Sequence, residues 1–499
     1  YISQSDVTRY SDNVFYLDAR LNYARSFGKH NVTAMAMYMM RQYISSVLPQ
    51  RNQGFSGRAT YDYANRYLAE FNFGYNGTER LEAGKRYEFF PAMSLGWVAS
   101  NEKFWTPIID VVNYFKLRSS YGLVGSDETG LYAGAPHYLY LSNVNMNGGG
   151  NFESGVTGGL SQQGPMVNSY PVSNASWERA TEFDIGVDLQ LFNQFNFTFD
   201  WFSSKRDRIL MKRASFPSVL GYQNAIPWAN VGKVDNMGFE FSANWTKQIN
   251  KDWFIDARVN WTYSRNKYVY VDEPDYPYVW QTQTGKPLDA MRGYIADGLF
   301  ESQAEIDASP DQTIFGSTIM PGDIRYRDIN GDNRITAEDQ VMLSPYGNMP
   351  RIQYGFGISV QWKNLDVSVF FNGSAKRNIM LTGLYPFCAN DSNDNNLMKW
   401  IADSHWSEGA DNSNVLYPRL GTLSTQISNN NQPSSWWMRD GSFLRFKTLE
   451  IGYRLKWFRL YFSADNLAVW SKFKYWDPEL SFNSYPLQRT FNIGLQFNL

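Results

Sequence analysis

Apolar and polar residues alternate along the last stretch of the chain, residues 491–499. Phe491, Ile493 and Leu495 lie on one face of an extended chain, and Asn492 and Gln496 lie on the other. Successive side chains of a strand point to opposite faces, so the pattern predicts a strand with an uncharged apolar face and a polar face. A transmembrane β-strand has this arrangement, because one face contacts lipid and the other faces a wet interior.

The same alternation recurs along most of the chain. Residues 67–76, 183–191, 253–266 and 352–362 each place aromatic or aliphatic side chains on one face and small, amide or charged side chains on the other. A face that carries charged and amide groups cannot pack into a dry core, but it can line a water-filled interior. We expect roughly 15 such strands.

The connections between these strands alternate between short and long. Segments 125–174, 271–350 and 373–441 are the largest interruptions. Outer-membrane barrels have short periplasmic turns and long extracellular loops, whereas sandwiches and propellers do not keep this alternation. The sequence therefore predicts an all-β fold, a transmembrane antiparallel β-barrel over residues 1–499. The expected short turns lie near Lys29, Asn65, Lys103, Gln194, Lys251, Asn364 and Trp457.

The strand count suggests that the barrel is partial. A bacterial single-chain barrel normally has an even number of strands, and about 15 does not fit that rule. The sequence opens at Tyr1 in polar residues with no signal peptide, which an outer-membrane protein needs. We therefore expect a C-terminal part of a barrel, with the early strands absent.

Composition excludes several other classes. The 499 residues carry a net charge of −2, which gives no general attraction to nucleic acid. There is no run of about 18 apolar residues, which excludes a helical membrane protein. Aromatic residues make up 17% of the chain, a surplus that interfacial girdles would explain and that a carbohydrate-binding protein would share. The single Cys388 excludes a disulfide framework.

One acidic segment, residues 328–339, has the spacing of a calcium-binding loop. Oxygen-bearing side chains stand at loop positions one, three, five and twelve, and position seven would offer a backbone carbonyl. Position six is Asn333, a residue that tolerates the left-handed conformation required there. The alternative is an Asn/Asp-rich turn without a metal. The predicted ligands of a structural Ca²⁺ are Asp328, Asn330, Asp332, Arg334 and Asp339.

The long loops also contain aromatic residues that could stack on a ligand. Rings of this kind bind sugar faces or apolar ligand surfaces, although they can equally pack the loops together or join an interfacial girdle. Catalysis has little support, because His137 and His405 stand in long loops without a recognisable nucleophile or metal motif. The candidate substrate-binding residues are Tyr222, Trp228, Trp280, Trp436 and Trp437.

Several stretches, in order from residue 90 to the end, resemble the SusC/RagA-type TonB-dependent outer-membrane transporters of Bacteroidetes. The sequence departs from that pattern at Asn333, where Gly is common, and at Leu499, where Phe is frequent. The matching stretches are Phe90-Pro91-Ala92 with Leu95-Gly96-Trp97, Leu117-Arg118-Ser119-Ser120-Tyr121-Gly122 with Gly125, Trp177-Glu178 with Gly186, Asn230-Val231-Gly232 with Asn236, Gly238 and Glu240, Gly322-Asp323-Ile324 with Asp328-Ile329-Asn330-Gly331-Asp332, and Asn466-Leu467 with Tyr475-Trp476-Asp477-Pro478-Glu479.

The resemblance implies a 22-stranded barrel with an N-terminal plug, of which this chain would be the C-terminal part. It implies import of glycan or peptide fragments, driven by TonB through the absent N-terminal part and assisted by a SusD-like surface lipoprotein. The expected location is the outer membrane of a Gram-negative, Bacteroidetes-type cell, with lipid around the barrel. Two other functions stay open: a passive porin-like channel, and an outer-membrane hydrolase that uses His137 or His405.

Overall fold

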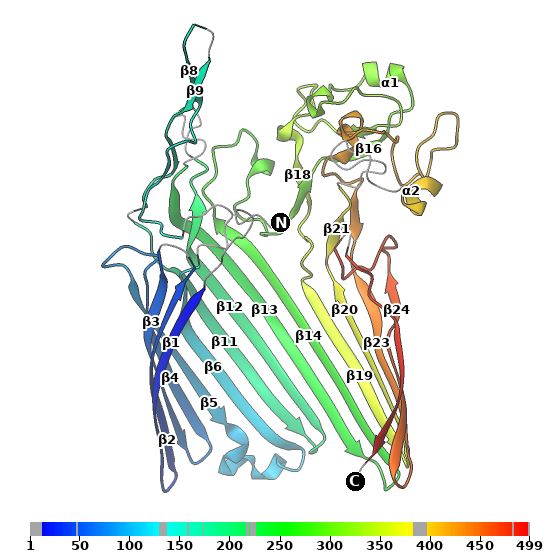
Figure 1. Cartoon of the computed structure of the whole chain (residues 1–499). Coiled ribbons are helices and arrows are strands. Elements are labelled where there is room, and N and C mark those ends of the chain that lie inside the picture. Colours follow the sequence, from blue (N-terminus) through cyan, green and yellow to red (C-terminus); the bar gives the residue numbers. More distant parts are fainter. Residues whose placement is uncertain are drawn as a thin grey trace, which may run out of the picture. The chain divides into compact units, whose positions relative to one another are not determined.

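Fifteen long strands form one sheet in the computed structural model, which describes residues 12–45, 48–128, 137–156, 159–172, 174–215, 219, 226–382, 397–481 and 484–497. The strands follow sequence order, and each pair with a resolved register is antiparallel (Figure 1). The all-β prediction and the expected strand number are thus confirmed. The strands are β1 (Asn13–Phe27), β2 (His30–Ile44), β3 (Gln50–Tyr63), β4 (Tyr67–Thr78), β5 (Tyr87–Val98), β6 (Val112–Ser126), β11 (Glu178–Leu191), β12 (Phe195–Lys212), β13 (Trp228–Gln248), β14 (Trp253–Tyr270), β19 (Ile352–Trp362), β20 (Leu365–Ala375), β23 (Phe443–Arg454), β24 (Phe458–Ser471) and β25 (Thr490–Phe497).

From β6 onward, short and long connections alternate along this sheet, as the sequence predicts. Before β6 they do not: the connection near Lys103, between β5 and β6, contains η2 and η3 and is longer than those between β2 and β3 and between β4 and β5. Tight turns join β1 to β2, β3 to β4, β11 to β12, β13 to β14, β19 to β20 and β23 to β24. Several of these turns need a left-handed residue, with φ of 62° at Gly28, 55° at Asn65 and 50° at Lys363. The long connections from β6 onward all leave the opposite end of the sheet, which we call the long-loop end.

The two faces of the strands differ as expected. On β19, Phe356 and Ile358 are each 40% exposed, while the intervening Gly357 is buried. On the polar face of β6, a guanidinium nitrogen of Arg118 lies 3.3 Å from a carboxylate oxygen of Asp188, and another lies 2.6 Å from one of Asp200. Large apolar side chains are therefore left on one side of the sheet and paired charges on the other, as lipid and a wet interior require.

Strands β12 and β13 are longer than the sequence pattern predicts. In the sequence, the alternation that begins at Phe195 stops near Ser203 and resumes at Met237, which predicts a loop that reaches Lys233. In the structure, β12 continues to Lys212 and β13 already begins at Trp228. A left-handed residue, Arg208 with φ 56°, interrupts the strict alternation there. Beyond it Leu210 is buried, because the strands extend past the lipid-facing band and pack under loops.

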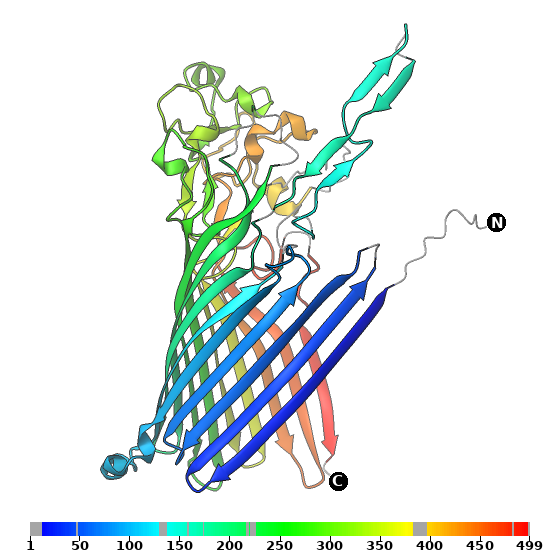
Figure 2. The same cartoon turned by 90° about the vertical axis from the view of Figure 1, so that its left-hand side faces the viewer.

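The chain divides into two compact units, Tyr1–Ala243 with Asn266–Asp275, and Asn244–Arg265 with Tyr276–Leu499. In the first unit, β1 to β6 lie side by side, and the segment after β6 forms two small ribbons (Figure 2). A cluster around Leu139, Trp177 and Leu210 forms its main buried core. The shorter elements of this unit are η2 (Ala99–Asn101), η3 (Lys103–Ile108), β7 (Asn143–Asn145), β8 (Asn151–Ser154), β9 (Leu160–Gln163) and β10 (Met166–Ser169).

In the second unit, the segments that follow β14 and β20 fold together at the long-loop end of β19 to β24 (Figure 1). We call this assembly, of residues 276–351, 376–382 and 397–442, the loop domain. Within the described residues, no helix is long and apolar enough to cross a membrane. The shorter elements are η5 (Val279–Gln281), β15 (Met291–Gly293), β16 (Ala296–Leu299), α1 (Gln303–Asp307), η6 (Thr313–Phe315), β17 (Ile324–Tyr326), η7 (Ala337–Asp339), β18 (Val341–Ser344), β21 (Asn378–Met380), α2 (Lys399–Asp403), η8 (Ser424–Gln426), η9 (Asn429–Asn431) and β22 (Met438–Asp440).

Candidate functional site

The loop domain has a hydrophobic core like that of a water-soluble domain. Its central side chains come from both loops, and Phe473 joins them from the connection after β24. Trp437 is 1% exposed, its ring centroid lies 5.3 Å from that of Tyr417, and its Nε1 donates to the carbonyl of Asn430 at 2.6 Å. Burial raises the pKa of Tyr326, so its hydroxyl stays neutral and donates to the carbonyl of Asn429 at 2.7 Å.

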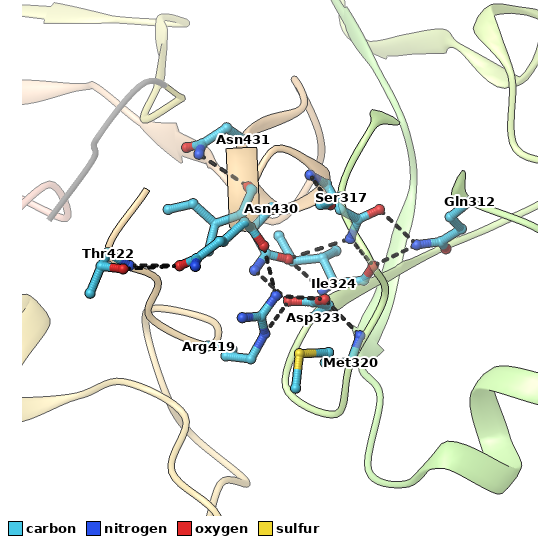
Figure 3. A network of polar contacts seen from close by, with 12 residues as sticks. Gln312, Ser317, Met320, Asp323, Ile324, Arg419, Thr422, Asn430 and Asn431 are labelled. Atoms are coloured by element: carbon cyan, nitrogen blue, oxygen red, sulfur yellow. Dashed lines mark hydrogen bonds and ion pairs between the residues drawn. The ribbon is translucent and has the colours of Figure 1, made fainter. Parts of the chain in front are cut away.

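A buried polar network joins the two loops (Figure 3). Asp323 is fully buried and accepts hydrogen bonds from Arg419 Nε at 2.9 Å and Nη2 at 3.1 Å. Asn430 Nδ2 donates to the same carboxylate at 2.8 Å, and the amide of Met320 donates at 2.9 Å. Both carboxylate oxygens are therefore satisfied, which is the condition under which a buried charge is tolerated.

Amide side chains extend this network to the backbone. Asn430 Oδ1 accepts from the amide of Ile324 at 2.8 Å, and Asn429 Nδ2 donates to the carbonyl of Ile324 at 2.9 Å. Gln312 Nε2 donates to Asn429 Oδ1 at 2.9 Å, while its Oε1 accepts from the amide of Tyr326 at 2.7 Å. A short strand of one loop is thus held by side chains of the other, which fixes the shape of the surface above it.

A cavity of about 990 Å³ opens beside this network, between the two loops of the loop domain. Its lining combines the rings of Trp406 and Trp436 with the charged groups of Glu305, Arg325 and Asp411. Such a volume lies at the upper end of ordinary ligand pockets, and rings beside carboxylates can hold both apolar faces and hydroxyl or amino groups. Among the residues that the structure describes, we regard this cavity as the candidate ligand site.

The predicted aromatic ligand residues are not gathered at one place. Trp436 lines the cavity, whereas Trp437 is enclosed in the core beneath it. Trp280 stacks on Tyr278 at 4.5 Å between ring centroids and donates from Nε1 to the carbonyl of Glu338 at 2.7 Å. Its indole edge therefore supports the acidic loop.

Two other candidates of this group lie elsewhere. Trp228 was expected in a long loop, but it is the buried first residue of β13, in the core of the first unit. The longer course of β13 explains this difference. Tyr222 lies outside the described residues. The burial of Trp228 and Trp437 does not favour ligand stacking at either ring, which leaves Trp436 as the best-placed candidate.

The acidic loop is closed by hydrogen bonds to its own backbone. The carboxylate of Asp328 accepts from the amides of Gly331 at 2.7 Å and Asn333 at 2.8 Å. That of Asp332 accepts from the amide of Arg334 at 2.8 Å. Asn333 has φ 63°, the left-handed conformation that the sequence predicts at loop position six.

Asp339, the last residue of the acidic loop, also accepts hydrogen bonds from backbone amides of the loop. Asp339 is fully buried, and its two oxygens accept from the amides of Ile329 at 2.9 Å, Asn330 at 3.4 Å and Thr336 at 2.7 Å. Across the described ranges, no three His, Cys, Asp or Glu side chains gather where they could hold a metal ion. These hydrogen bonds account for the loop conformation without a metal, so calcium stays a prediction.

The two loop histidines belong to different units. His137, in the first unit, has Nε2 3.7 Å from a carboxylate oxygen of Glu79, and burial together with the nearby Arg80 lowers the pKa of His137. His405, in the second unit, has Nδ1 3.0 Å from the carbonyl oxygen of Ala402, at the end of α2. Among the residues described around them, neither histidine stands beside a nucleophile, as hydrolysis would require.

Sequence reasoning missed the residues that build the network. Gln312, Arg419, Asn429 and Asn430 were not predicted, because isolated polar residues in loops carry no periodic signal. One signal was available: Gly322-Asp323-Ile324 belonged to the stretches on which the family resemblance was based. The structure explains why Gly and Asp stand in this segment. Asp323 is the buried acceptor of the network, and Gly322, with φ 88°, leaves room for the ring of Trp406.

Comparisons with known proteins agree with this architecture. A family model described as "TonB dependent receptor-like, beta-barrel" matches residues 1–467. The TonB-dependent receptor P3 of Formosa agariphila is 24% identical, over 95% of this chain and 51% of the relative. The TonB-dependent receptor SusC of Bacteroides thetaiotaomicron is 26% identical, over 88% of this chain and 43% of the relative. The chain thus spans about half the length of these curated relatives.

Solved structures show the same fold. The RagAB peptide transporter matches 98% of this chain and 56% of its own with a TM-score of 0.71 and 19% identity. The same importer in its "closed-closed" state also gives a TM-score of 0.71, at 18% identity. The resemblance to SusC/RagA-type proteins, and with it the orientation of short periplasmic turns and long extracellular loops, is confirmed. The chain belongs to the TonB-dependent receptor-like β-barrel family and is an outer-membrane protein.

Proposed function

We propose that this chain is the barrel portion of a SusC/RagA-type importer that takes up oligosaccharide or peptide fragments with energy from TonB. The observation that carries this proposal is the family match over residues 1–467. A relative named SusC and a solved structure titled a peptide transporter support it. TonB would act through an N-terminal part with the plug and early strands, and a SusD-like lipoprotein would assist at the surface.

The cavity of the loop domain is the proposed first contact with the cargo. It belongs to the extracellular loops, and it places Trp436 and Trp406 beside Glu305, Arg325 and Asp411. Rings would cover apolar faces of a sugar or side chain, while carboxylates would accept hydrogen bonds from hydroxyl or ammonium groups. The same lining thus suits either class of cargo.

Uptake in cells that carry the full-length protein tests the proposal. We expect growth on either a peptide digest or an oligosaccharide mixture as the sole nutrient, and we expect that growth to stop when TonB is deleted. A passive porin would support growth without TonB, so growth that continues would contradict the proposal. Asp411→Asn with Trp436→Phe should weaken uptake, whereas the exposed Met349→Ala, outside the cavity lining, should not.

Calcium in the acidic loop is a separate proposal that rests on ligand spacing alone. Asp328, Asp332 and Asn330 offer side-chain oxygens with lone pairs beyond those used by backbone amides. Titration calorimetry of the full-length protein should show calcium binding that Asp332→Ala abolishes and Asp307→Ala, in nearby α1, preserves. Equal heats for the two variants would contradict the proposal, because Asp332 would then not be a calcium ligand.

A further inference from the structure

The connection between β5 and β6 differs from the other periplasmic connections. It runs from Val98 to Val112 and contains η2 and η3, whereas the others are tight turns. Figure 2 shows it as the coiled ribbon, coloured between blue and cyan, that extends beyond the strands. Its apolar side chains are exposed: Phe104 is 63% exposed, and Ile108, Ile109 and Val111 are between 41% and 47% exposed. Water alone is a poor environment for such a surface.

Hydrogen bonds hold this segment in one conformation. Trp105 Nε1 donates to the carbonyl of Val112 at 2.9 Å, and Asn113 Nδ2 donates to the carbonyl of Ile109 at 2.8 Å. Asn101 Nδ2 donates to the carbonyl of Asn65, in the neighbouring turn, at 2.6 Å. The exposed apolar groups therefore belong to a built element rather than to a frayed end.

The segment continues the lipid-facing surface of the strands. Trp97 pairs with Leu117, and both lie on the same face as Leu95, which is 54% exposed. The ring centroid of Trp97 lies 6.3 Å from that of Phe104. The ring of Trp105 stacks at 5.4 Å on Phe115, which alternates with Leu117 on the same outward face.

Charged groups frame the apolar surface. Glu102 is paired with Arg66 at 3.2 Å and accepts a hydrogen bond from Trp97 Nε1 at 3.4 Å. Lys103, the first residue of η3, and Asp110, two residues beyond its last residue, are both exposed. Aromatic rings with charged neighbours at the edge of a lipid-facing surface are typical of the membrane–water interface.

We propose that residues 99–111 form an interfacial anchor in the periplasmic leaflet of the outer membrane, with Phe104, Ile108, Ile109 and Val111 among lipid. The continuity with the lipid-facing strands identifies lipid, rather than a periplasmic protein, as the partner. The anchor would fix the depth of β5 and β6 in the bilayer, because the stacked rings join it rigidly to those strands. This assignment does not depend on the cargo or on TonB.

Spin labels in the full-length protein test the anchor. In a background with Cys388→Ser, cysteines are introduced singly as Phe104→Cys and Ile108→Cys. Leu95→Cys is the lipid control, and Met349→Cys, at an exposed position of the loop domain, is the water control. After reconstitution into phospholipid vesicles, collision with oxygen and with a water-soluble nickel chelate is measured. Oxygen partitions into the bilayer and the chelate stays in water.

The proposal predicts that labels at 104 and 108 behave like the label at 95, with a higher ratio of oxygen to nickel collisions than the label at 349. Labels at 104 and 108 that match the label at 349 would overturn it, because they would place the segment in water. Labels that neither reagent reaches would also overturn it, because a protein partner rather than lipid would then cover this surface. Each single label is conservative, and heat-modifiable gel migration confirms folding of every variant.

Discussion

Apolar side chains are exposed on the long strands but buried in the loop domain. Ile358 on β19 is 40% exposed, whereas Ile335 in the loop domain is fully buried. The strands are organised for two environments, with lipid on one side and water on the other. The loop domain lies in water and must bury its own apolar surface, as an ordinary soluble domain does. The difference shows that the surrounding solvent decides where apolar side chains go. In the strands they face outward toward lipid, and in the loop domain they are buried away from water.

Charged groups follow the same division. In the loop domain, Asp323 is fully buried and each of its oxygens is engaged by Arg419 or its neighbours. On the polar face of β6, Arg118 stays about one-third exposed among three aspartates. The stability of a buried ion pair depends on every one of its hydrogen bonds, because no water can replace a lost partner. The charges of a partly exposed cluster can form hydrogen bonds with water instead. The loop domain should therefore be the more sensitive of the two to loss of one charge.

The largest expected effect is that of Asp323→Ala. The substitution leaves Arg419 without its partner in the buried network, which costs about 3–5 kcal/mol for a pair of this kind. Hydrogen exchange should show faster opening of residues 312–326 and 427–437 with little change in the strands. The matched control is Asp403→Ala, which breaks an exposed pair with Lys399 and should cost less than about 1 kcal/mol.

Equal protection from hydrogen exchange in Asp323→Ala and Asp403→Ala would contradict this expectation, because the buried and the exposed ion pair would then contribute equally to the stability of the loop domain. Protection lost throughout the strands would contradict it in another way, since the loop domain would not be a separate folding unit.

A somewhat smaller effect is expected from Arg placed on the lipid face. Ile358→Arg puts a charge among lipid and should cost about 2–4 kcal/mol if the residue lies near the bilayer midplane. The neighbouring Ser359→Arg places the same charge on the polar face, where Ser359 now meets the hydroxyl of Ser368 at 2.8 Å. Urea unfolding of the full-length protein in vesicles compares the two. A larger loss from Ser359→Arg would reverse our assignment of the faces.

The strand region could be predicted from the sequence because its rule is local. Period-two alternation and the lengths of the connections specify the strands, their faces and the two ends of the sheet. The prediction was wrong where that rule stops, at Ser203 and Lys233, because β12 and β13 continue past the lipid-facing band into a region packed by loops. There Leu210 is covered by residues distant in the sequence, which alternation cannot show.

The loop domain could be predicted only in part, because its contacts are not local. Spacing alone indicated the left-handed Asn333 of the acidic loop. The hydrogen bond from Asn430 to Asp323 joins residues of different loops, which are too far apart in the sequence for a short motif to indicate the contact. An aromatic residue in such a loop is equally consistent with core and with ligand site, and Trp437 and Trp436 are neighbours with these two different surroundings.

The smallest expected effect concerns Asp272, in the segment that follows β14. Burial alone would raise the pKa of Asp272, but hydrogen bonds from Ser215 and the ion pair with Arg213, at 3.1 Å, outweigh it and hold that pKa below its ordinary value. A carboxylate with a lowered pKa in the folded state contributes stability above its unfolded pKa of about 3.9 and loses it as the pH falls through the folded value.

Acidification should therefore release the contact between Asp272 and Ser215 while the strands stay intact. Hydrogen exchange at the amide of Ser215, corrected for the intrinsic pH dependence of exchange, should accelerate below about pH 4. Asp272→Asn removes the titrating group and should make the corrected rate independent of pH in that range, whereas the exposed Asp275→Asn should leave the acceleration in place. Acceleration that persists in Asp272→Asn would assign the pH sensitivity to another group, and the contact would then be held by packing rather than by charge.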